Sequence, residues 1–245
     1  MRSALGEAER AAILALSGEC SPVEVRQEFV GIGERVDHAC LIVDGLTARF
    51  QALASGHRSV VALHVPGDMA DLHSVVAPEV TWALQAMTPS RILRIPHAAL
   101  HALAARYPAI AVAFWRDCVV DANILAQWTV NIGRKVSESR VAHLLCEMGL
   151  RYRLSGRGDV DHFPFPITQA NLADVVGLTP IHLNRVLRRL AGEGIAAKPG
   201  SEVIIDDVAR LAAIGEFDPA YLQLSRAFLE RDWAPICLTS DKRRN

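Results

Sequence analysis

The chain has 245 residues with a formal net charge of −1 at pH 7, and 51% of the residues are hydrophobic. The length suits two domains, and the hydrophobic share allows a sizeable buried core. A near-neutral total does not point to nucleic acid, yet DNA binding needs a local basic face rather than a basic total. The sequence has no run of about 18 uncharged apolar residues, so we expect no transmembrane helix and no membrane partner.

The N-terminus and the cysteines indicate the compartment. The first apolar stretch contains acidic residues, which is wrong for a secretory signal. The cysteines are scattered and form no CxxC pair, so we expect reduced, mostly buried thiols in a cytoplasmic protein. An iron–sulfur cluster would need closely spaced cysteines and is not predicted. The cysteines are Cys20, Cys40, Cys118, Cys146 and Cys237.

Following a short amphipathic helix at 7–17, β-prone runs alternate with turn signals from Val23 to Pro96. Asp44-Gly45 lies between two apolar runs and predicts a hairpin, and Ser55-Gly56 marks the next turn. Many short strands spaced by about ten residues predict an antiparallel barrel or jelly roll. The runs are 41–43, 46–53, 58–65, 80–87 and 91–95.

Helical patterns follow Pro96, first at 97–107 and then over a long stretch at 110–135. Apolar residues of the long helix recur at alternating spacings of four and three, like the seam of a two-stranded coiled coil. This seam predicts a homodimer, although the stripe could instead pack on the chain's own barrel. The seam residues are Ala111, Trp115, Cys118, Ala122, Leu125, Thr129, Ile132 and Val136. A second apolar stripe, which leaves one face for the barrel and one for a partner chain, comprises Val112, Val119, Val120 and Ile124.

The stretch 167–195 predicts two crossed helices. Thr168 is a candidate N-cap, Gly177 breaks the first helix, and Thr179-Pro180 begins the second. A small residue, a turn glycine and two branched residues have the spacing that a helix-turn-helix needs; they are Ala173, Gly177, Leu183 and Val186. Before this motif, Ser137 is the expected N-cap of a helix at 138–151 and marks a domain boundary.

The second of these helices has a polar, basic face, as a helix that enters the major groove should have. A short β-hairpin pattern at 194–205 follows directly, with Lys198 near its tip, where a phosphate contact is reasonable. The alternative is a structural helical hairpin whose arginines are merely solvated. The predicted DNA-binding residues are Thr168, Gln169, Thr179, Pro180, Ile181, His182, Asn184, Arg185, Arg188, Arg189 and Lys198.

With these features the chain resembles the Crp/Fnr family, named for the cyclic AMP receptor protein and the fumarate–nitrate reduction regulator. The resemblance covers roughly 5–215, with Pro66-Gly67-Asp68 as the turn of the roll and Ile95-Pro96 closing it. It implies an α+β fold: an N-terminal antiparallel β-roll of the cyclic-nucleotide-binding type at 1–109, a dimerisation helix at 110–136, and a C-terminal winged helix-turn-helix with a tail at 137–245.

The resemblance also implies a transcription regulator that binds an inverted-repeat operator in double-stranded DNA as a homodimer, with RNA polymerase as a partner if it activates. Arg185 falls on the family's base-reading arginine, which meets guanine. Many members carry glutamate where Ile181 stands here, and isoleucine suits a thymine methyl instead. The family's best-known half-site is therefore not expected.

The roll departs from the cyclic-nucleotide binders, which grip their ligand with a Gly-Glu pair and an Arg-Ser pair. The segment 69–76 has no Gly-Glu, and no arginine lies between Val75 and Met87. A buried phosphate without a cation is strongly unfavourable, so cyclic AMP is not expected. We predict no cofactor; haem stays open, although no histidine is marked as an axial ligand. Candidates for an effector pocket are His64, Asp71, His73 and Leu125.

Other kinds of function have less support. The second hypothesis is a small-molecule or haem sensor that signals through protein contacts. An enzyme is not predicted, because no nucleophile elbow, HExxH or phosphate loop is present. No metal site is predicted either, since His97 and His101 favour a capping role over a ligand pair. In the last stretch, 221–233 could form a helix, and Lys242-Arg243-Arg244 reads as a solvated tail.

Overall fold

The computed structural model describes residues 5–52 and 58–233, which form two compact units that divide between Leu125 and Ala126. The predicted Ser55-Gly56 turn, Cys237 and the Lys242-Arg243-Arg244 tail lie outside the described residues. In the described ranges, no helix combines the length and apolarity needed to cross a membrane. The domain boundaries that the sequence predicts after residues 109 and 136 remain predictions.

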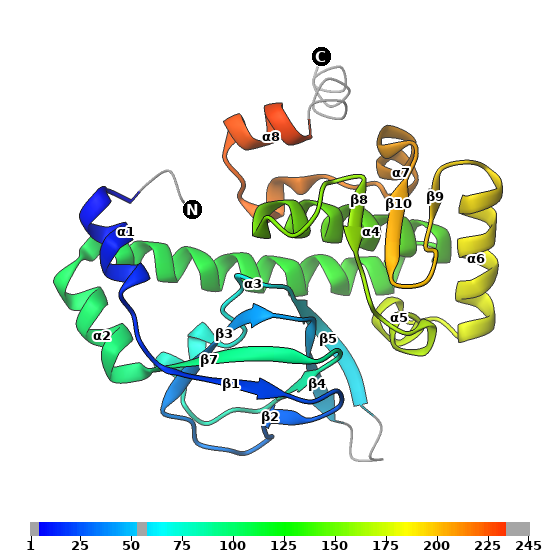
Figure 1. The fold of residues 1–245 in the computed structure, drawn as a ribbon. Helices are drawn as coiled ribbons and strands as arrows, with labels where there is room; N and C mark the ends of the chain where they lie inside the picture. Colours follow the sequence, from blue (N-terminus) through cyan, green and yellow to red (C-terminus); the bar gives the residue numbers. More distant parts are fainter. Residues whose placement is uncertain (1–4, 53–57, 234–245) are drawn as a thin grey trace. The chain divides into compact units, whose positions relative to one another are not determined.

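Two antiparallel sheets make up the roll of the first unit (Figure 1). One sheet has the order β1-β7-β3, with strands Glu19–Val23, Ser90–Pro96 and His38–Asp44. The other has the order β2-β6-β4-β5, with strands Glu28–Val30, Ala83–Ala86, Thr47–Ala52 and Arg58–His64. The predicted antiparallel β-roll is thereby confirmed.

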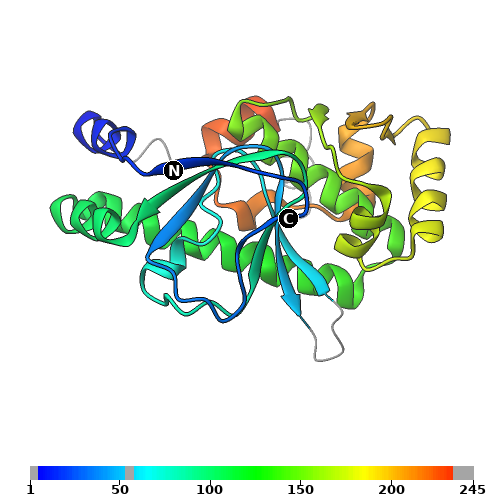
Figure 2. The same ribbon diagram turned by 60° about the horizontal axis from the view of Figure 1, so that its bottom comes forward.

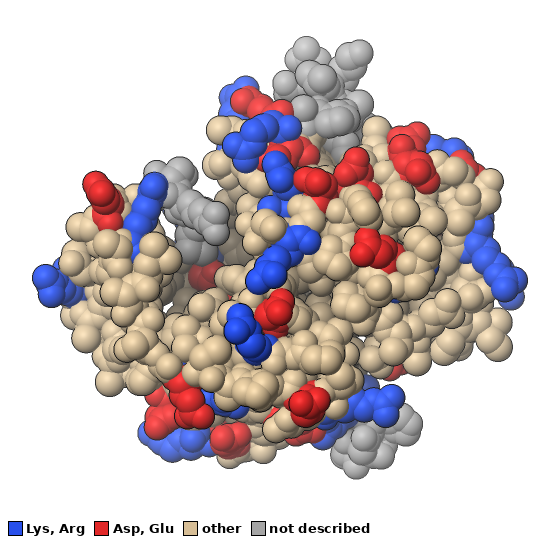
Figure 3. Space-filling view, in the orientation of Figure 1, with Lys and Arg blue, Asp and Glu red and all other residues tan. Residues whose placement is uncertain are grey.

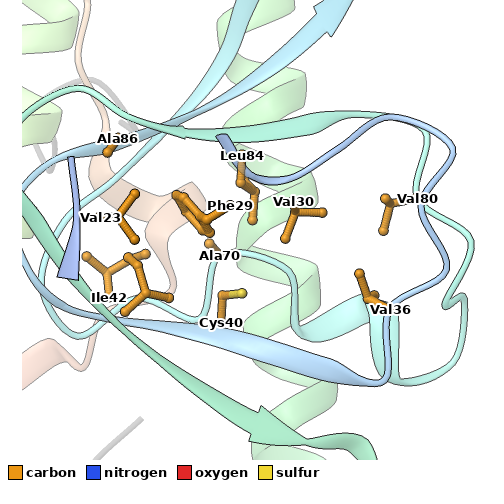
Figure 4. Close-up of a cluster of buried hydrophobic side chains, with 11 residues drawn as sticks. Val23, Phe29, Val30, Val36, Cys40, Ile42, Ala70, Val80, Leu84 and Ala86 are labelled. Atoms are coloured by element: carbon orange, nitrogen blue, oxygen red, sulfur yellow. The ribbon is translucent and has the colours of Figure 1, made fainter. Parts of the chain in front are cut away.

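The core of the roll draws apolar side chains from both sheets (Figure 4). Cys40 and Ile42 come from β3, and Val30 and Leu84 come from β2 and β6 of the other sheet. Each fully buried aliphatic side chain contributes about 1.5–3 kcal/mol relative to exposure. The two sheets are therefore held together by this shared core rather than by strand pairing.

The Asp44-Gly45 hairpin prediction is wrong. The strands on either side of it, β3 and β4, belong to different sheets and do not pair with each other. A side chain at Gly45 would collide with the backbone at the start of β7, and the N–H of Leu46 donates to Thr88 Oγ1 at 2.9 Å. Because these contacts lead the chain across to the second sheet, the turn is a corner between sheets.

Helices precede and follow the strands of the roll, and one 3₁₀ turn lies between β5 and β6. They are α1 at Glu7–Leu14, the 3₁₀ turn η1 at Leu72–Val75, α2 at His97–Arg106 and α3 at Pro108–Arg134. Phe114 and Cys118 of α3 pack on a second apolar cluster that includes Leu100 and Ile95. Part of α3 therefore packs on the chain's own roll. This agrees with the alternative interpretation of the apolar stripe, in which it covers the barrel and not a partner chain.

The second unit contains the helices α4 to α8 and a three-stranded antiparallel sheet of order β8-β10-β9. The helices are α4 at Ser137–Ser155, α5 at Gln169–Val176, α6 at Pro180–Gly192, α7 at Val208–Gly215 and α8 at Arg226–Asp232. The strands are β8 at His162–Pro164, β9 at Ala196–Ala197 and β10 at Glu202–Ile205, and the 3₁₀ turn η2 spans Pro219–Leu222.

Two boundary predictions in this unit need correction. Val136, not Ser137, is the N-cap of α4, and the helix extends past 151 because Tyr152 is buried and stacks on Phe163. The helix expected at 221–233 is divided, since Gln223 has a left-handed φ of 52° and Ser225 caps a new helix.

Candidate functional site

Local capping rules fix the geometry of the α5–α6 motif. Thr168 Oγ1 accepts from the N–H of Asn171 at 3.2 Å, so Thr168 is the predicted N-cap of α5. Gly177 ends α5 with a φ of 64°, a region that glycine enters without steric cost. Thr179 then caps α6 and Pro180 occupies its first turn. The predicted helix-turn-helix is confirmed.

One face of α6 is buried. Leu183, Val186 and Leu190 lie inside the unit, and Leu172 and Ala173 of α5 are also fully buried. In Figures 1 and 2, α5 and α6 lie side by side at the edge of the ribbon. Asn184 Nδ2 also donates to Gln169 Oε1 at 3.4 Å and joins the two helices on their polar side. The buried face fixes which side chains α6 presents outward.

The outward face of α6 carries the predicted basic residues. Arg185 and Arg188 are exposed, and neither has a hydrogen-bond or ion-pair partner in the described part of the chain. Figure 3 has the orientation of Figure 1, in which α6 lies at the right, and Lys and Arg atoms protrude at this right edge. Ile181 is 78% exposed and His182 is exposed beside it. The face thus combines free guanidinium groups with one accessible apolar side chain.

Two other predicted DNA contacts are engaged within the protein. Arg189 pairs with Glu138 at 3.1 Å and with Glu193 at 3.0 Å. Lys198 Nζ donates to the backbone oxygen of Gly200 at 2.7 Å, and partial burial lowers the pKa of this lysine. Arg189 and Lys198 would therefore have to give up these contacts to bind DNA, whereas Arg185 would not.

The predicted seam of α3 is divided between two environments. Trp115 is 69% exposed and Ala122 is also exposed, and Val112 and Val119 of the second predicted stripe are exposed next to them. Cys118 is half-buried and faces the roll instead. Within the second unit, Thr129, Ile132 and Val136 are exposed.

A cavity of about 440 Å³ lies in the first unit. Of the predicted pocket residues, His73 and Leu125 line it, whereas His64 and Asp71 are buried outside its lining. Asp71 Oδ1 instead accepts from the N–H of Cys40 at 2.6 Å. The lining residues are Arg49, Gln51, Val61, His73, Trp82, Cys118, Asp121, Ala122 and Leu125.

Sequence reasoning missed the charged centre of this cavity. Arg49 of β4 donates from Nη1 to Asp121 Oδ2 of α3 at 2.8 Å and from Nη2 to the backbone oxygen of Ala70. Its guanidinium carbon lies 5.3 Å from the ring centre of Trp82, and the His73 ring lies 4.4 Å from the same indole. Burial, with a smaller contribution from the charge of Arg49, lowers the pKa of His73 to about 4, so its ring is neutral at pH 7.

An antiparallel roll, a long helix and a winged helix-turn-helix with a basic outward face define a DNA-binding regulator with a sensor-type domain. Comparisons with known proteins agree. The model of the Crp-like helix-turn-helix domain matches residues 139–214, and the model of the cyclic nucleotide-binding domain matches 23–107.

Related proteins span most of the chain. The nitrogen fixation regulation protein FixK of Azorhizobium caulinodans is 22% identical over 81% of this chain and 79% of its own. The transcriptional activator protein FnrL of Cereibacter sphaeroides is 25% identical over 76% of this chain and 75% of its own. The structure of FixK2 from Bradyrhizobium japonicum has the same fold, with a TM-score of 0.73 and 23% identity over 81% of this chain and 98% of that one. The chain belongs to the Crp/Fnr family of transcription regulators.

Ligands associated with such domains can be compared with the residues present. In the part of the chain that the structure describes, no three His, Cys, Asp or Glu side chains gather, so these residues do not fit an iron–sulfur cluster. A cyclic nucleotide would need a cation for its phosphate, and the arginine of the cavity lining is Arg49. This arginine already forms an ion pair with Asp121. The residues present therefore do not form a free phosphate site.

Proposed function

We propose that this regulator acts as a homodimer that binds an inverted-repeat operator, with α6 of each protomer in the major groove of one half-site. The observation that carries the proposal is a pair of guanidinium groups without a partner among residues 5–52 and 58–233. They belong to Arg185 and Arg188, on the face of α6 opposite Leu183 and Val186. A recognition helix needs this combination of a packed inner face and free outward donors.

Base reading falls to the first two turns of α6, which lie nearest the base edges in this motif. Arg185 is the proposed reader of guanine, a contact that contributes about 1–3 kcal/mol of discrimination. Ile181 is exposed and apolar, which suits a thymine methyl, and His182 is a further reader. The proposed half-site therefore contains a guanine and a nearby thymine.

The remaining residues of the interface are proposed to hold the phosphate backbone. Thr168 and Thr179 place the N-termini of α5 and α6 at the surface, where backbone N–H groups attract anions. Arg188 adds a free cation. The proposed supporting contacts are Gln169, Pro180, Asn184, Arg189 and Lys198.

The proposed dimer contact runs along the exposed stripe of α3. Trp115 at 69% exposure is a large apolar side chain that a partner helix would cover, and the exposed Ala122 of the same stripe and Val119 of the neighbouring stripe extend this surface. Thr129 and Ile132 extend the contact toward the C-terminal end of α3, while Cys118 and Leu125 lie at its border, next to the cavity.

The test is a selection of binding sites from random duplex DNA at near-physiological salt without added effector. The wild type is expected to enrich an inverted repeat with half-sites about one helical turn apart. Arg185→Ala should lose this enrichment, and Arg226→Ala, at an exposed arginine of α8, should keep it. Equal enrichment by wild type and Arg185→Ala would contradict the proposed reading.

Two further parts of the proposal concern partners and place. If the regulator activates, RNA polymerase is the expected partner, and a transcription assay with purified polymerase would test this contact. The proposed place of action is the bacterial cytoplasm, where the operator DNA lies.

A further inference from the structure

Lys135 is the residue between the end of α3 and Val136, the N-cap of α4. Its ammonium group contacts three acceptors, which are Gly215 O at 2.7 Å, His143 Nδ1 at 3.0 Å and Glu216 O at 3.3 Å. A lysine ammonium has three N–H groups, so each of them has an acceptor here. The side chain therefore ties the link between α3 and α4 to the C-terminal end of α7.

The end of α7 is shaped for this contact. Glu216, the residue after the helix, has a left-handed φ of 45°, which is sterically unfavourable for a residue with a Cβ atom. Gly215 approaches α4 so closely that a Cβ atom there would lie 2.7 Å from the backbone nitrogen of His143. Because Lys135 donates to the oxygens of both residues, it stabilises this turn and the negative end of the α7 dipole.

His143 extends the contact into a chain of hydrogen bonds with one direction. A lysine ammonium can only donate, so Nδ1 of His143 must accept and the ring proton lies on Nε2. Nε2 then donates to the hydroxyl of Tyr221 at 3.2 Å, and Tyr221 donates to the carboxylate of Glu147 at 2.7 Å. Burial, with a smaller contribution from the charge of Lys135, lowers the pKa of His143 to about 3, so the ring is neutral at pH 7 and free to accept.

The backbone oxygen of Lys135 connects the same residue to the helix-turn-helix. It accepts from Arg140 Nε at 2.9 Å, and Nη1 of this arginine donates to the oxygens of Val176 and Gly177, each at 3.4 Å. Gly177 ends α5 and forms the turn that leads into α6. The side chain of Lys135 thus holds α7, while its backbone holds the arginine that supports this turn.

We propose that Lys135 is a positioning residue for DNA binding, which acts with His143 and the segment 215–221 as a brace for the helix-turn-helix. Lys135 precedes, and the segment 215–221 follows, the residues 139–214 that match the Crp-like helix-turn-helix model. A segment beyond the matched domain thereby helps to present α6. The effect of the brace on operator binding rests on the proposed function, whereas its hydrogen bonds do not.

The test is the operator affinity of the full chain in Lys135→Met, which keeps the length of the side chain and removes its donors. The affinity should fall about tenfold, because the turn loses its support. Each lost phosphate contact would reduce the log–log salt slope of binding by about 0.9, whereas loss of the brace leaves this slope unchanged. Arg226→Met, at an exposed arginine of α8, is the control and should change neither quantity. Unchanged affinity in Lys135→Met, or a reduced slope, would overturn the proposal.

A matched pair of variants at His143 covers the case in which Lys135→Met does not fold. His143→Gln supplies one acceptor and one donor group, as the ring does, and should keep operator affinity within about twofold of the wild type. His143→Leu supplies neither and should lose about tenfold. Equal operator affinities of the two variants would contradict the brace.

Nitrogen-15 NMR of the histidine-labelled full chain, recorded at pH 7 without DNA, tests the hydrogen bonds separately. We expect His143 to be the neutral Nε2–H tautomer, with its signals assigned by their loss in His143→Gln. In Lys135→Met, Gly215 O, which lies 3.3 Å from Nδ1, should draw the proton to that nitrogen. An Nδ1–H tautomer in the wild type would overturn the brace. A wild type that selects no operator but shows the Nε2–H tautomer would contradict the proposed function and leave the brace standing.

Discussion

Trp128 donates its indole N–H to Glu147 Oε2 at 3.0 Å. Glu147 lies on α4 with 0% exposure, and its carboxylate also accepts from Tyr221 at 2.7 Å and from Arg151 at 3.0 Å. One buried carboxylate thus joins the last part of α3 to α4 and to the 3₁₀ turn η2. The C-terminal turns of α3 are consequently part of the winged-helix unit.

Replacing this carboxylate should be severely destabilising. In Glu147→Gln, an amide replaces the charged member of the buried pair with Arg151, and the free energy of unfolding should fall by about 3 kcal/mol. Urea unfolding, followed by tryptophan fluorescence, measures the change. Glu230→Gln is the control, because its pair with Arg226 is exposed, and it should change stability by less than about 0.5 kcal/mol. Equal effects of the two substitutions would show that burial of the network does not matter.

Asp71 should make stability depend on pH in the direction opposite to an ordinary salt-bridged aspartate. Burial raises the pKa of Asp71 to about 6, above the value of about 3.9 for an unfolded chain. Between these values the folded state binds the extra proton, so the contribution of Asp71 to stability rises as pH falls from about 6 to about 4 and is lost above pH 6.

Asp71→Asn isolates this contribution. Relative to the wild type, the variant should gain about 2 kcal/mol of unfolding free energy between pH 4.5 and pH 7.5. The comparison is needed because burial lowers the pKa of His73 to about 4, and this histidine makes both proteins lose stability as pH falls through that range. A difference between the two proteins that stays constant with pH would contradict the raised pKa.

The two free arginines of α6 should behave differently in DNA binding. Arg185→Ala is expected to weaken binding to the selected operator by about 1–3 kcal/mol and to relax discrimination at one base pair. Arg188→Ala should weaken operator and random DNA alike, because a phosphate contact carries no sequence information. Anisotropy titrations against the operator, a single-base variant and random duplex distinguish these outcomes. Loss of discrimination in Arg188→Ala instead would exchange the two roles.

Dimerisation should depend on the exposed stripe of α3. Trp115→Glu puts a charge into the proposed seam and should shift the chain from dimer to monomer in sedimentation equilibrium. Arg106→Glu is the control, because this exposed arginine lies on α2 and not on α3, and the variant should remain dimeric. A monomeric wild type, or an unchanged dimer in Trp115→Glu, would remove α3 as the dimer contact.

The helix-turn-helix could be predicted because its determinants are local. Thr168, Gly177 and Thr179 act on backbone groups within about three or four residues, and capping and turn rules describe such short ranges. The alternating spacing of four and three residues that predicts the seam of α3 can also be found in the sequence alone. Which part of the stripe stays exposed depends on the roll, which takes Cys118 for its own packing.

Long-range pairings could not be predicted from one sequence. Arg49 and Asp121 are separated by 72 positions, and nothing near either residue indicates the other. Asp44-Gly45 signals a chain reversal, but the choice between a hairpin and a corner depends on the contacts that Gly45 and Leu46 make with distant strands. Sheet assignment and the centre of the cavity therefore required the folded chain.

The ion pairs of Arg189 bear on how the regulator would search a genome. Each protein cation that meets a phosphate displaces condensed counterions and steepens the salt dependence of binding by about 0.9 in log–log slope. Arg189 is already neutralised by Glu138 and Glu193, so it displaces few ions from DNA. Arg189 on its own therefore adds little to the attraction that holds the protein on random sequence between encounters with its operator, and the unpaired Arg188 is expected to contribute more to it.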